Sequence, residues 1–135
     1  MELVWSEKYH NLNYPKLDEV HREFIEIYNS VYTSDVSIKE TLAKLHDHTK
    51  EHFIIEEREM VEFHYPRIYE HKQEHQRVLW EMEYFLNLTN SLFGQNLMKK
   101  YFTDKLPEWF TLHLANLDSD LSSFLNSKKG QKSGN

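Results

Sequence analysis

Residues 52–75 read HFIIEEREMVEFHYPRIYEHKQEH. Two helical patterns meet here at Pro66, because a proline ends the helix before it and can open the next one. Each pattern carries one pair of polar side chains four residues apart: His52/Glu56 and His71/His75. Residues with this spacing lie only about 40° apart around an ideal helix, so each pair shares one face. The segment therefore predicts two successive helices, each with a pair of polar side chains on one face.

These two helices have recognisable ends. The first is expected to begin near Ser37, because Ser37 and Glu40 have the spacing of a capping box, and to end near Phe63. The second is expected to open at Pro66 and to stop or turn at Gly94.

Two further helices flank this pair. One should follow Pro15, after an irregular arm over residues 1–15, and the last should cover about 95–125. Pro107 should kink or restart that last helix. Only three Gly and three Pro leave few turns, so the links are short. The pattern predicts an all-α, up-down-up-down four-helix bundle.

Length and composition limit the function. The 135 residues suit one domain, expected over 1–126, followed by a flexible C-terminal tail over 127–135. The net charge of −6 argues against nucleic acid as a partner. No apolar run approaches the length of about 20 residues that a membrane span needs. With no secretory signal in the first residues, we expect a cytoplasmic protein.

Histidine is frequent, with nine residues in the chain. Apolar residues define an inward face on each expected helix, and each of these faces carries at least one His. The inward-facing set is His21 on the first helix, His52 and Glu56 on the second, His71 and His75 on the third, and His113 on the fourth. Burying such groups without partners is costly. A metal removes that cost, because neutral imidazole and carboxylate are good ligands of iron or zinc.

A purely structural role for these histidines competes with the metal site. A single buried His is usually a hydrogen-bonded core residue, and one His pair among nine is unremarkable. Chance does not readily explain why all four expected helices place a His on their inward face, one of them together with a Glu. The remaining four, His10, His46, His48 and His64, are expected at the surface or behind the ligands.

At these residues the sequence resembles the hemerythrin family. The matches are His52-Phe53-x2-Glu56-Glu57, Tyr65-Pro66 and His71-x3-His75 in the central motif, Trp109-x3-His113-Leu114-x3-Asp118 in the closing motif, Asp18-x2-His21 in the opening motif, and Trp5 and Tyr9 in the aromatic arm. The resemblance covers residues 5 to about 121 and is closest to the single-domain bacterial members.

The resemblance implies a non-haem di-iron centre with seven protein ligands. One iron would be held by His71, His75 and His113, and the other by His21 and His52, while Glu56 and Asp118 bridge both with an oxo or hydroxo group. The irons would alternate between Fe2+ and Fe3+. One iron keeps an open position for dioxygen. The function implied is reversible dioxygen binding, for transport, storage or delivery.

Asp118 fits an ideal helix less simply. Five residues separate His113 from Asp118, which places them about 140° apart. We predict a local irregularity there, such as a π-bulge, or a long side-chain reach. Asp120 is better aligned, but seven residues span about 10 Å, too far to share one ion pair with His113. The assignment of Asp118 thus rests on the resemblance.

Phe110 departs from the family pattern, in which the residue after the Trp is commonly Leu and lines the oxygen pocket. A larger ring should narrow that pocket, and Phe24 should narrow it further. We therefore predict altered dioxygen access or autoxidation.

Other functions compete with the carrier. A ferritin-like di-iron enzyme or iron store needs Glu-x-x-His on two helices, whereas this chain has the motif only at Glu7/His10, in the arm. A zinc site rarely spreads seven ligands over two ions. A sensor of oxygen, iron or redox state would use the same di-iron site and stays an alternative.

No nucleophile–base pair or phosphate loop is evident in the sequence, so we expect a non-enzyme. Dioxygen and an oxygen-using recipient enzyme are the expected partners, and the oligomeric state is left open.

Overall fold

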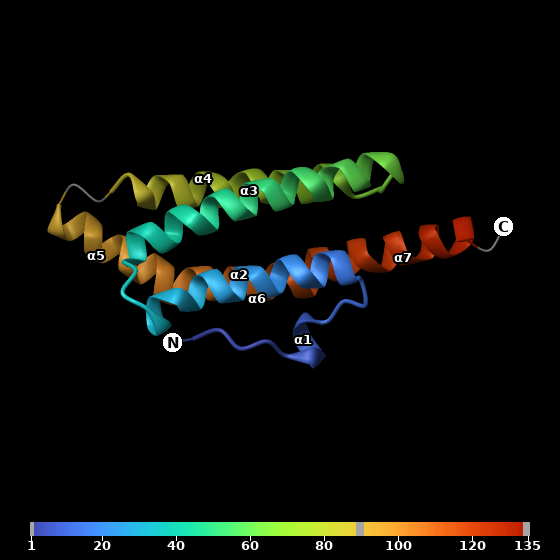
Figure 1. Cartoon of the computed structure of the whole chain (residues 1–135). Helices are drawn as coiled ribbons and strands as arrows, with labels where there is room; N and C mark the ends of the chain where they lie inside the picture. The colour runs from blue at the N-terminus through green and yellow to red at the C-terminus, as the bar shows by residue number, and fades with distance from the viewer. Residues whose placement is uncertain (1, 89–90, 134–135) are drawn as a thin grey trace.

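The computed structural model describes residues 2–88 and 91–133, apart from the side chains of Tyr9 and residues 131–133. Its regular elements in these ranges are all helical (Figure 1). They are α1 (Glu7–His10), α2 (Pro15–Thr33), α3 (Ile38–Glu62), α4 (Ile68–Leu86), α5 (Leu92–Lys100), η1 (Tyr101–Lys105), α6 (Leu106–His113), η2 (Leu114–Asp118) and α7 (Ser119–Ser133). The run from α5 to α7 forms one rod, which lies with α2, α3 and α4 in a four-helix bundle (Figure 1). The predicted all-α bundle is confirmed.

The predicted starts of the first two long helices are confirmed. Pro15 is the first residue of α2, where its missing N–H costs no helical hydrogen bond. Ser37 precedes α3, and its side-chain oxygen accepts a hydrogen bond from the Glu40 N–H at 3.1 Å. His64 follows the end of α3 in a left-handed conformation with φ of 56°, which reverses the chain toward α4.

The expected role of Gly94 is wrong. Helix α4 already ends at Leu86, and Gly94 lies in the first turn of α5, where its N–H donates to the Ser91 hydroxyl at 3.0 Å. A Cβ at Gly94 would lie 1.6 Å from the Leu88 carbonyl oxygen. Glycine is needed here because the preceding loop comes so close, not because the helix stops.

The fourth rod is interrupted twice and is longer than expected. The π-helix η1 is followed by a restart at α6, which has Pro107 in its first turn, as predicted for this proline. Helix α7 continues to Ser133, past the expected end near residue 125. Residues 127–133 of the expected tail are therefore helical, residues 134–135 lie outside the described part, and the flexibility of the tail stays a prediction.

The N-terminal arm folds back along the bundle. Its short helix α1 packs against η2 and places His10 against the ring of Phe110, with ring centroids 5.8 Å apart. His10 is only 6% exposed, so it lies behind the candidate site and not at the surface. Among the described residues, no helix has the length and apolar character required to cross a bilayer.

Candidate metal centre

Seven side chains from all four rods meet in the middle of the bundle. They come from α2 (His21), α3 (His52 and Glu56), α4 (His71 and His75), α6 (His113) and η2 (Asp118), and all are buried. Their ligand atoms form two groups, with the atoms of each group within 4.8 Å of one another: Glu56, His71, His75 and His113 in one, and His21, His52 and Asp118 in the other. The structure thus brings together every residue of the expected ligand set.

Glu56 connects the two groups. Its Oε1 atom lies 2.9 Å from Nε2 of His71 and 3.3 Å from Nε2 of His75. Its Oε2 atom lies 2.8 Å from Nε2 of His52, in the other group. Each oxygen of this carboxylate therefore faces a different group.

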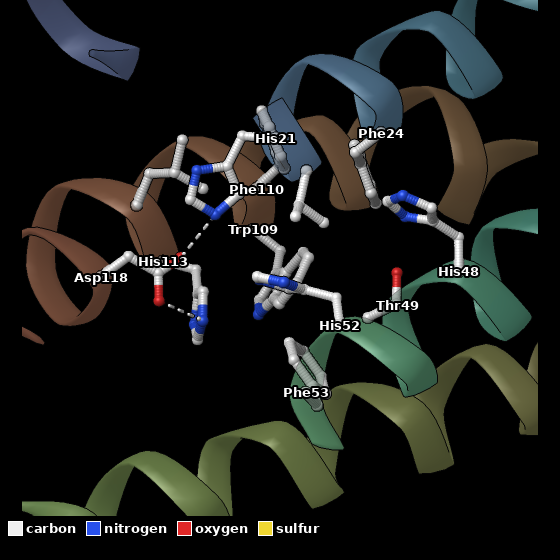
Figure 2. A pocket seen from close by; sticks show the side chains of 12 residues that line it. His21, Phe24, His48, Thr49, His52, Phe53, Trp109, Phe110, His113 and Asp118 are labelled. Carbon is white, nitrogen blue, oxygen red and sulfur yellow. Dashed lines mark ion pairs between the residues drawn. The ribbon is translucent and has the colours of Figure 1, made fainter. Parts of the chain in front are cut away.

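Asp118 connects the groups in the same way. Its Oδ1 atom lies 3.1 Å from Nε2 of His71 and 3.3 Å from Nε2 of His113. Its Oδ2 atom lies 3.1 Å from Nε2 of His21 (Figure 2). Two carboxylates from different rods thus face both histidine groups.

These atoms approach one another without forming well-directed hydrogen bonds. The Nε2 atoms of all five histidines and the four carboxylate oxygens are buried and have no hydrogen-bond partner among the described residues. Buried polar atoms are normally satisfied, and each orphan costs about 1–3 kcal/mol. Lone pairs that converge in this way on shared points match the requirements of bound cations, so the residues present fit a metal site.

The charges of the cluster depend on one another. Burial and the nearby Asp118 would raise the pKa of Glu56, but contacts with His52 and His71 hold it well below its usual range. Burial likewise opposes ionisation of Asp118, while His113, His21 and His71 lower its pKa well below the usual range. Both carboxylates are therefore ionised and available as ligands.

A π-helix brings Asp118 into the site. The predicted irregularity between His113 and Asp118 is confirmed, because Leu114–Asp118 form η2, and the Ser119 N–H bonds to the Leu114 carbonyl five residues earlier. One extra residue in this turn rotates Asp118 back toward the face of His113. Asp120, the better-aligned residue on an ideal helix, instead accepts a hydrogen bond from the Tyr65 hydroxyl.

An outer layer of side chains orients the histidines. Oε2 of Glu57 lies 2.9 Å from Nδ1 of His75, and the ring of Phe53 stacks on the same imidazole with centroids 3.6 Å apart. Trp109 stacks on His113 at 5.0 Å and donates its indole N–H to Glu74. The sequence analysis placed Glu57 in the central motif but gave it no role. The one sequence feature that could have indicated this role is its position directly after the ligand Glu56.

A small pocket adjoins the cluster. Its volume is about 20 Å³, enough for one water-sized molecule. Phe24 and Phe110 stack in its wall with ring centroids 4.4 Å apart and nearly parallel planes (Figure 2). The expected placement of both rings beside the site is thus observed.

The remaining histidines lie outside the cluster. His46 and His48 pair with carboxylates of neighbouring helices: His46 with Glu83 at 2.9 Å and His48 with Glu23 at 3.1 Å. His64 is exposed in the turn after α3.

Comparison with known proteins agrees with this geometry. The family model for the hemerythrin HHE cation-binding domain matches residues 12–125. No curated protein and no solved structure matches the chain. Residues 12–125 include every member of the buried cluster, the whole of α2, α3 and α4, and the fourth rod as far as residue 125. The chain therefore belongs to the hemerythrin family of HHE cation-binding domains.

Proposed function

We propose that this protein binds two iron ions at the buried cluster and binds dioxygen reversibly in the adjoining pocket. The main observation behind the proposal is that each of the two carboxylates has one oxygen facing each histidine group. Glu56 and Asp118 each direct one oxygen to the group with three histidines and the other to the group with two. A pair of metal ions bridged by two carboxylates accounts for both orientations at once.

The ligand count supports an open position beside the pocket. His71, His75 and His113 would hold one iron and His21 and His52 the other, so the second iron has one protein ligand fewer. The pocket is lined by all three members of the smaller group, His21, His52 and Asp118, and by His113 of the larger group. A coordination position left open on the second iron would therefore have a space of suitable size beside it.

The set of ligand side chains favours reversible binding of dioxygen over its irreversible reduction. Five neutral imidazoles and two carboxylates bring less negative charge than a ferritin-like set, so high-valent iron is stabilised less. When bound, a ferrous pair would supply the electrons that dioxygen binding needs. The chain's own contribution is to hold both ions through Glu56 and Asp118 and to exclude water with the Phe24–Phe110 stack.

Pocket size supports a carrier over an enzyme with an organic substrate. About 20 Å³ accommodates a diatomic molecule, whereas pockets for drug-sized ligands measure about 300–1,000 Å³. Transport, storage or delivery to an oxygen-using enzyme would all use this site. An oxygen-using recipient enzyme and a cytoplasmic location stay predictions.

Two measurements on the purified protein test the proposal. Metal analysis should find two irons per chain, one for each ligand group. Zinc, or no metal, would overturn it in favour of a zinc or structural histidine cluster. An optical titration of the reduced protein with dioxygen should then show a charge-transfer band that disappears when dioxygen is removed. Bleaching without recovery would favour an oxidase or a sensor instead.

A further inference from the structure

The outer face of α4 carries a stripe of exposed side chains without a charge. Steps of three or four residues stay on one face of a helix, and on this face they give Tyr69, Gln73, Gln76, Trp80 and Tyr84. The exposed fractions of the three aromatic side chains are 71% for Tyr69, 62% for Trp80 and 47% for Tyr84. The outward face of a surface helix normally carries charged residues, so an uncharged aromatic stripe indicates a contact surface. Figure 1 shows α4 at the upper edge of the bundle and the N-terminal arm along the opposite side, so the arm does not cover this stripe.

The side chains of the stripe are already ordered by contacts within the chain. Trp80 stacks on Tyr84 with ring centroids 5.5 Å apart, and the amide of Gln73 donates to the Tyr69 hydroxyl at 2.8 Å. Side chains that are fixed before binding lose less conformational entropy when a partner covers them. Trp and Tyr are also the residue types enriched among those that contribute most to protein–protein binding.

The order of residues along the stripe is symmetric. Tyr69 and Tyr84 lie equally far from the point between residues 76 and 77, and so do Gln73 and Trp80. A two-fold interface requires such a self-complementary surface, because each residue must meet the residue that is its counterpart across the axis. A second copy of α4, running antiparallel, would therefore bring Tyr69 against Tyr84 and Gln73 against Trp80.

We propose that two copies of this chain form a dimer in which their α4 helices pack antiparallel about a two-fold axis between residues 76 and 77. The aromatic stripe is the centre of the contact, and each copy covers the stripe of the other. The dimer requires no metal ion, so it does not depend on the proposed function.

The charges beside the stripe are compatible with this pairing. Lys72 and Glu83 are 11 residues apart, about three turns, and so lie on the same side of α4. In the antiparallel pair, Glu83 of one copy is offset by only about 3 Å along the axis from Lys72 of the other, which places opposite charges together twice. Arg77 lies near its counterpart at the axis, but its guanidinium is 2.6 Å from both Glu74 and Glu81 of its own chain, so its charge is balanced.

The area of the stripe suits a dimer that dissociates on dilution. An aromatic side chain contributes about 150–250 Å², so the exposed fractions of the three rings leave roughly 300–450 Å² of aromatic surface on each copy. Two copies would bury roughly twice that area, about half of the 1,200–2,000 Å² that a stable complex buries in total. The two glutamines and the charged residues beside the stripe add to this area. A reversible dimer is therefore expected.

Sedimentation equilibrium of the purified full chain tests the dimer. Between about 1 µM and about 1 mM, the molar mass should rise from that of one chain toward that of two. Trp80→Glu should raise the dissociation constant at least about tenfold, because it removes the largest ring of the stripe and introduces a charge. A chain that stays monomeric throughout would overturn the proposal and leave the stripe to a different partner. A Trp80→Glu variant that dimerises as well as the unmodified chain would also overturn it.

Ile55→Glu is the matched control. Ile55 is an apolar side chain that is 41% exposed. It lies about two turns after His48, whose ring pairs with Glu23 of α2, and therefore on the side of α3 that faces away from α4. The dissociation constant should not change in this variant. Equal weakening by Ile55→Glu and Trp80→Glu would indicate non-specific association of apolar side chains and contradict the α4 interface.

Cysteine cross-linking tests the position of the axis, and the chain has no cysteine of its own. In the antiparallel pair the two copies of Gln76 are offset by one residue, about 1.5 Å along the axis, whereas the two copies of Gln73 are offset by seven residues, about 10 Å. A disulfide requires Cα atoms within about 7 Å. Mild oxidation should therefore link the Gln76→Cys chain into a covalent dimer but not the Gln73→Cys chain. Equal linking of both variants, or of neither, would overturn the proposed arrangement.

Discussion

Nδ1 of His75 lies 2.9 Å from Oε2 of Glu57, which ties a buried imidazole to a carboxylate near the surface. The other ring nitrogen, Nε2, faces Oε1 of Glu56 at 3.3 Å. Because an ionised carboxylate can only accept, Nδ1 carries the proton and donates it to Glu57. With a metal ion bound beside Glu56, Nε2 would then present its lone pair to that ion.

Glu57→Ala is expected to weaken metal binding by about 10–100-fold, because the tautomer and orientation of His75 are no longer fixed. Glu57→Gln keeps an acceptor oxygen and should lose less. Competition with a chelator of known affinity measures the effect. Glu51→Ala is a suitable control, because Glu51 is an exposed carboxylate on the same helix. Equal affinities in Glu57→Ala and Glu51→Ala would rule out this role for Glu57.

Asp118→Asn should reduce the metal content from two ions per chain to one or none. An amide has a single acceptor oxygen, so it can serve only one of the two histidine groups that Asp118 now faces. The control is Asp120→Asn, two residues further on, where the carboxylate accepts from Tyr65 and does not belong to either ligand group. Metal analysis of folded samples decides the matter, and full occupancy in Asp118→Asn would contradict a bridging role.

Much of the bundle could be predicted from sequence because its signals are local. The Ser37–Glu40 cap lies within four residues, and the apolar faces repeat with the helical period. The family resemblance placed Asp118 among the ligands, and a spacing of five from His113 cannot place both side chains on one face of an α-helix. Together they predicted either a local irregularity or a long side-chain reach, and the π-helix Leu114–Asp118 is the irregularity.

Other features depend on contacts between distant segments and leave no periodic signal. His10 is buried because the arm folds back onto η2. No local sequence pattern in residues 1–15 predicts that contact. The prediction for Gly94 was wrong because the residue must be small for another reason: the Leu88 carbonyl of the preceding loop leaves no room for a Cβ. Glu59 is buried at the end of α3 because Tyr14 and Lys16 of another segment bond to it. Such tertiary contacts decide a residue's role without altering its local pattern.

Without metal, the stability of the chain should fall as the pH rises from about 6.5 to 9.5. Burial would lower the pKa of His71, but contacts with Asp118 and Glu56 raise it to about 9, above the ordinary value of 6.5. The folded-state pKa is the higher one, so the stabilisation is complete below pH 6.5 and is lost as the pH rises through about 9. One pKa unit corresponds to about 1.4 kcal/mol, so the loss reaches a few kcal/mol at most.

Urea unfolding at the two ends of this pH range measures the change. In the metal-loaded chain, His71 is already deprotonated, so stability should change less over the same range. Chelation at neutral pH should also lower the unfolding midpoint, because binding to the folded state alone stabilises it. An identical pH dependence with and without metal would contradict the placement of His71 among the ligands.

Phe110→Leu is expected to speed both dioxygen binding and autoxidation. Phe110 is 2% exposed, stacks on Phe24 at 4.4 Å and presents its ring to His21 at 6.0 Å, so it forms the wall between the pocket and the buried arm. A leucine side chain is smaller and leaves additional space beside the smaller ligand group. The substitution should also cost stability, but less than the roughly 3–5 kcal/mol typical of Phe→Ala in a core.

Phe102→Leu separates the effect of the pocket from the effect of lost packing. Phe102 is also fully buried and stacks on an aromatic ring, Tyr28, at 4.3 Å, but it does not line the pocket. Both variants should lose comparable stability in urea unfolding, because each removes one stacked phenyl ring from the core. Stopped-flow mixing with dioxygen and the rate of spontaneous oxidation should change only in Phe110→Leu. Unchanged rates in that variant would show that the Phe24–Phe110 stack does not control access to the centre.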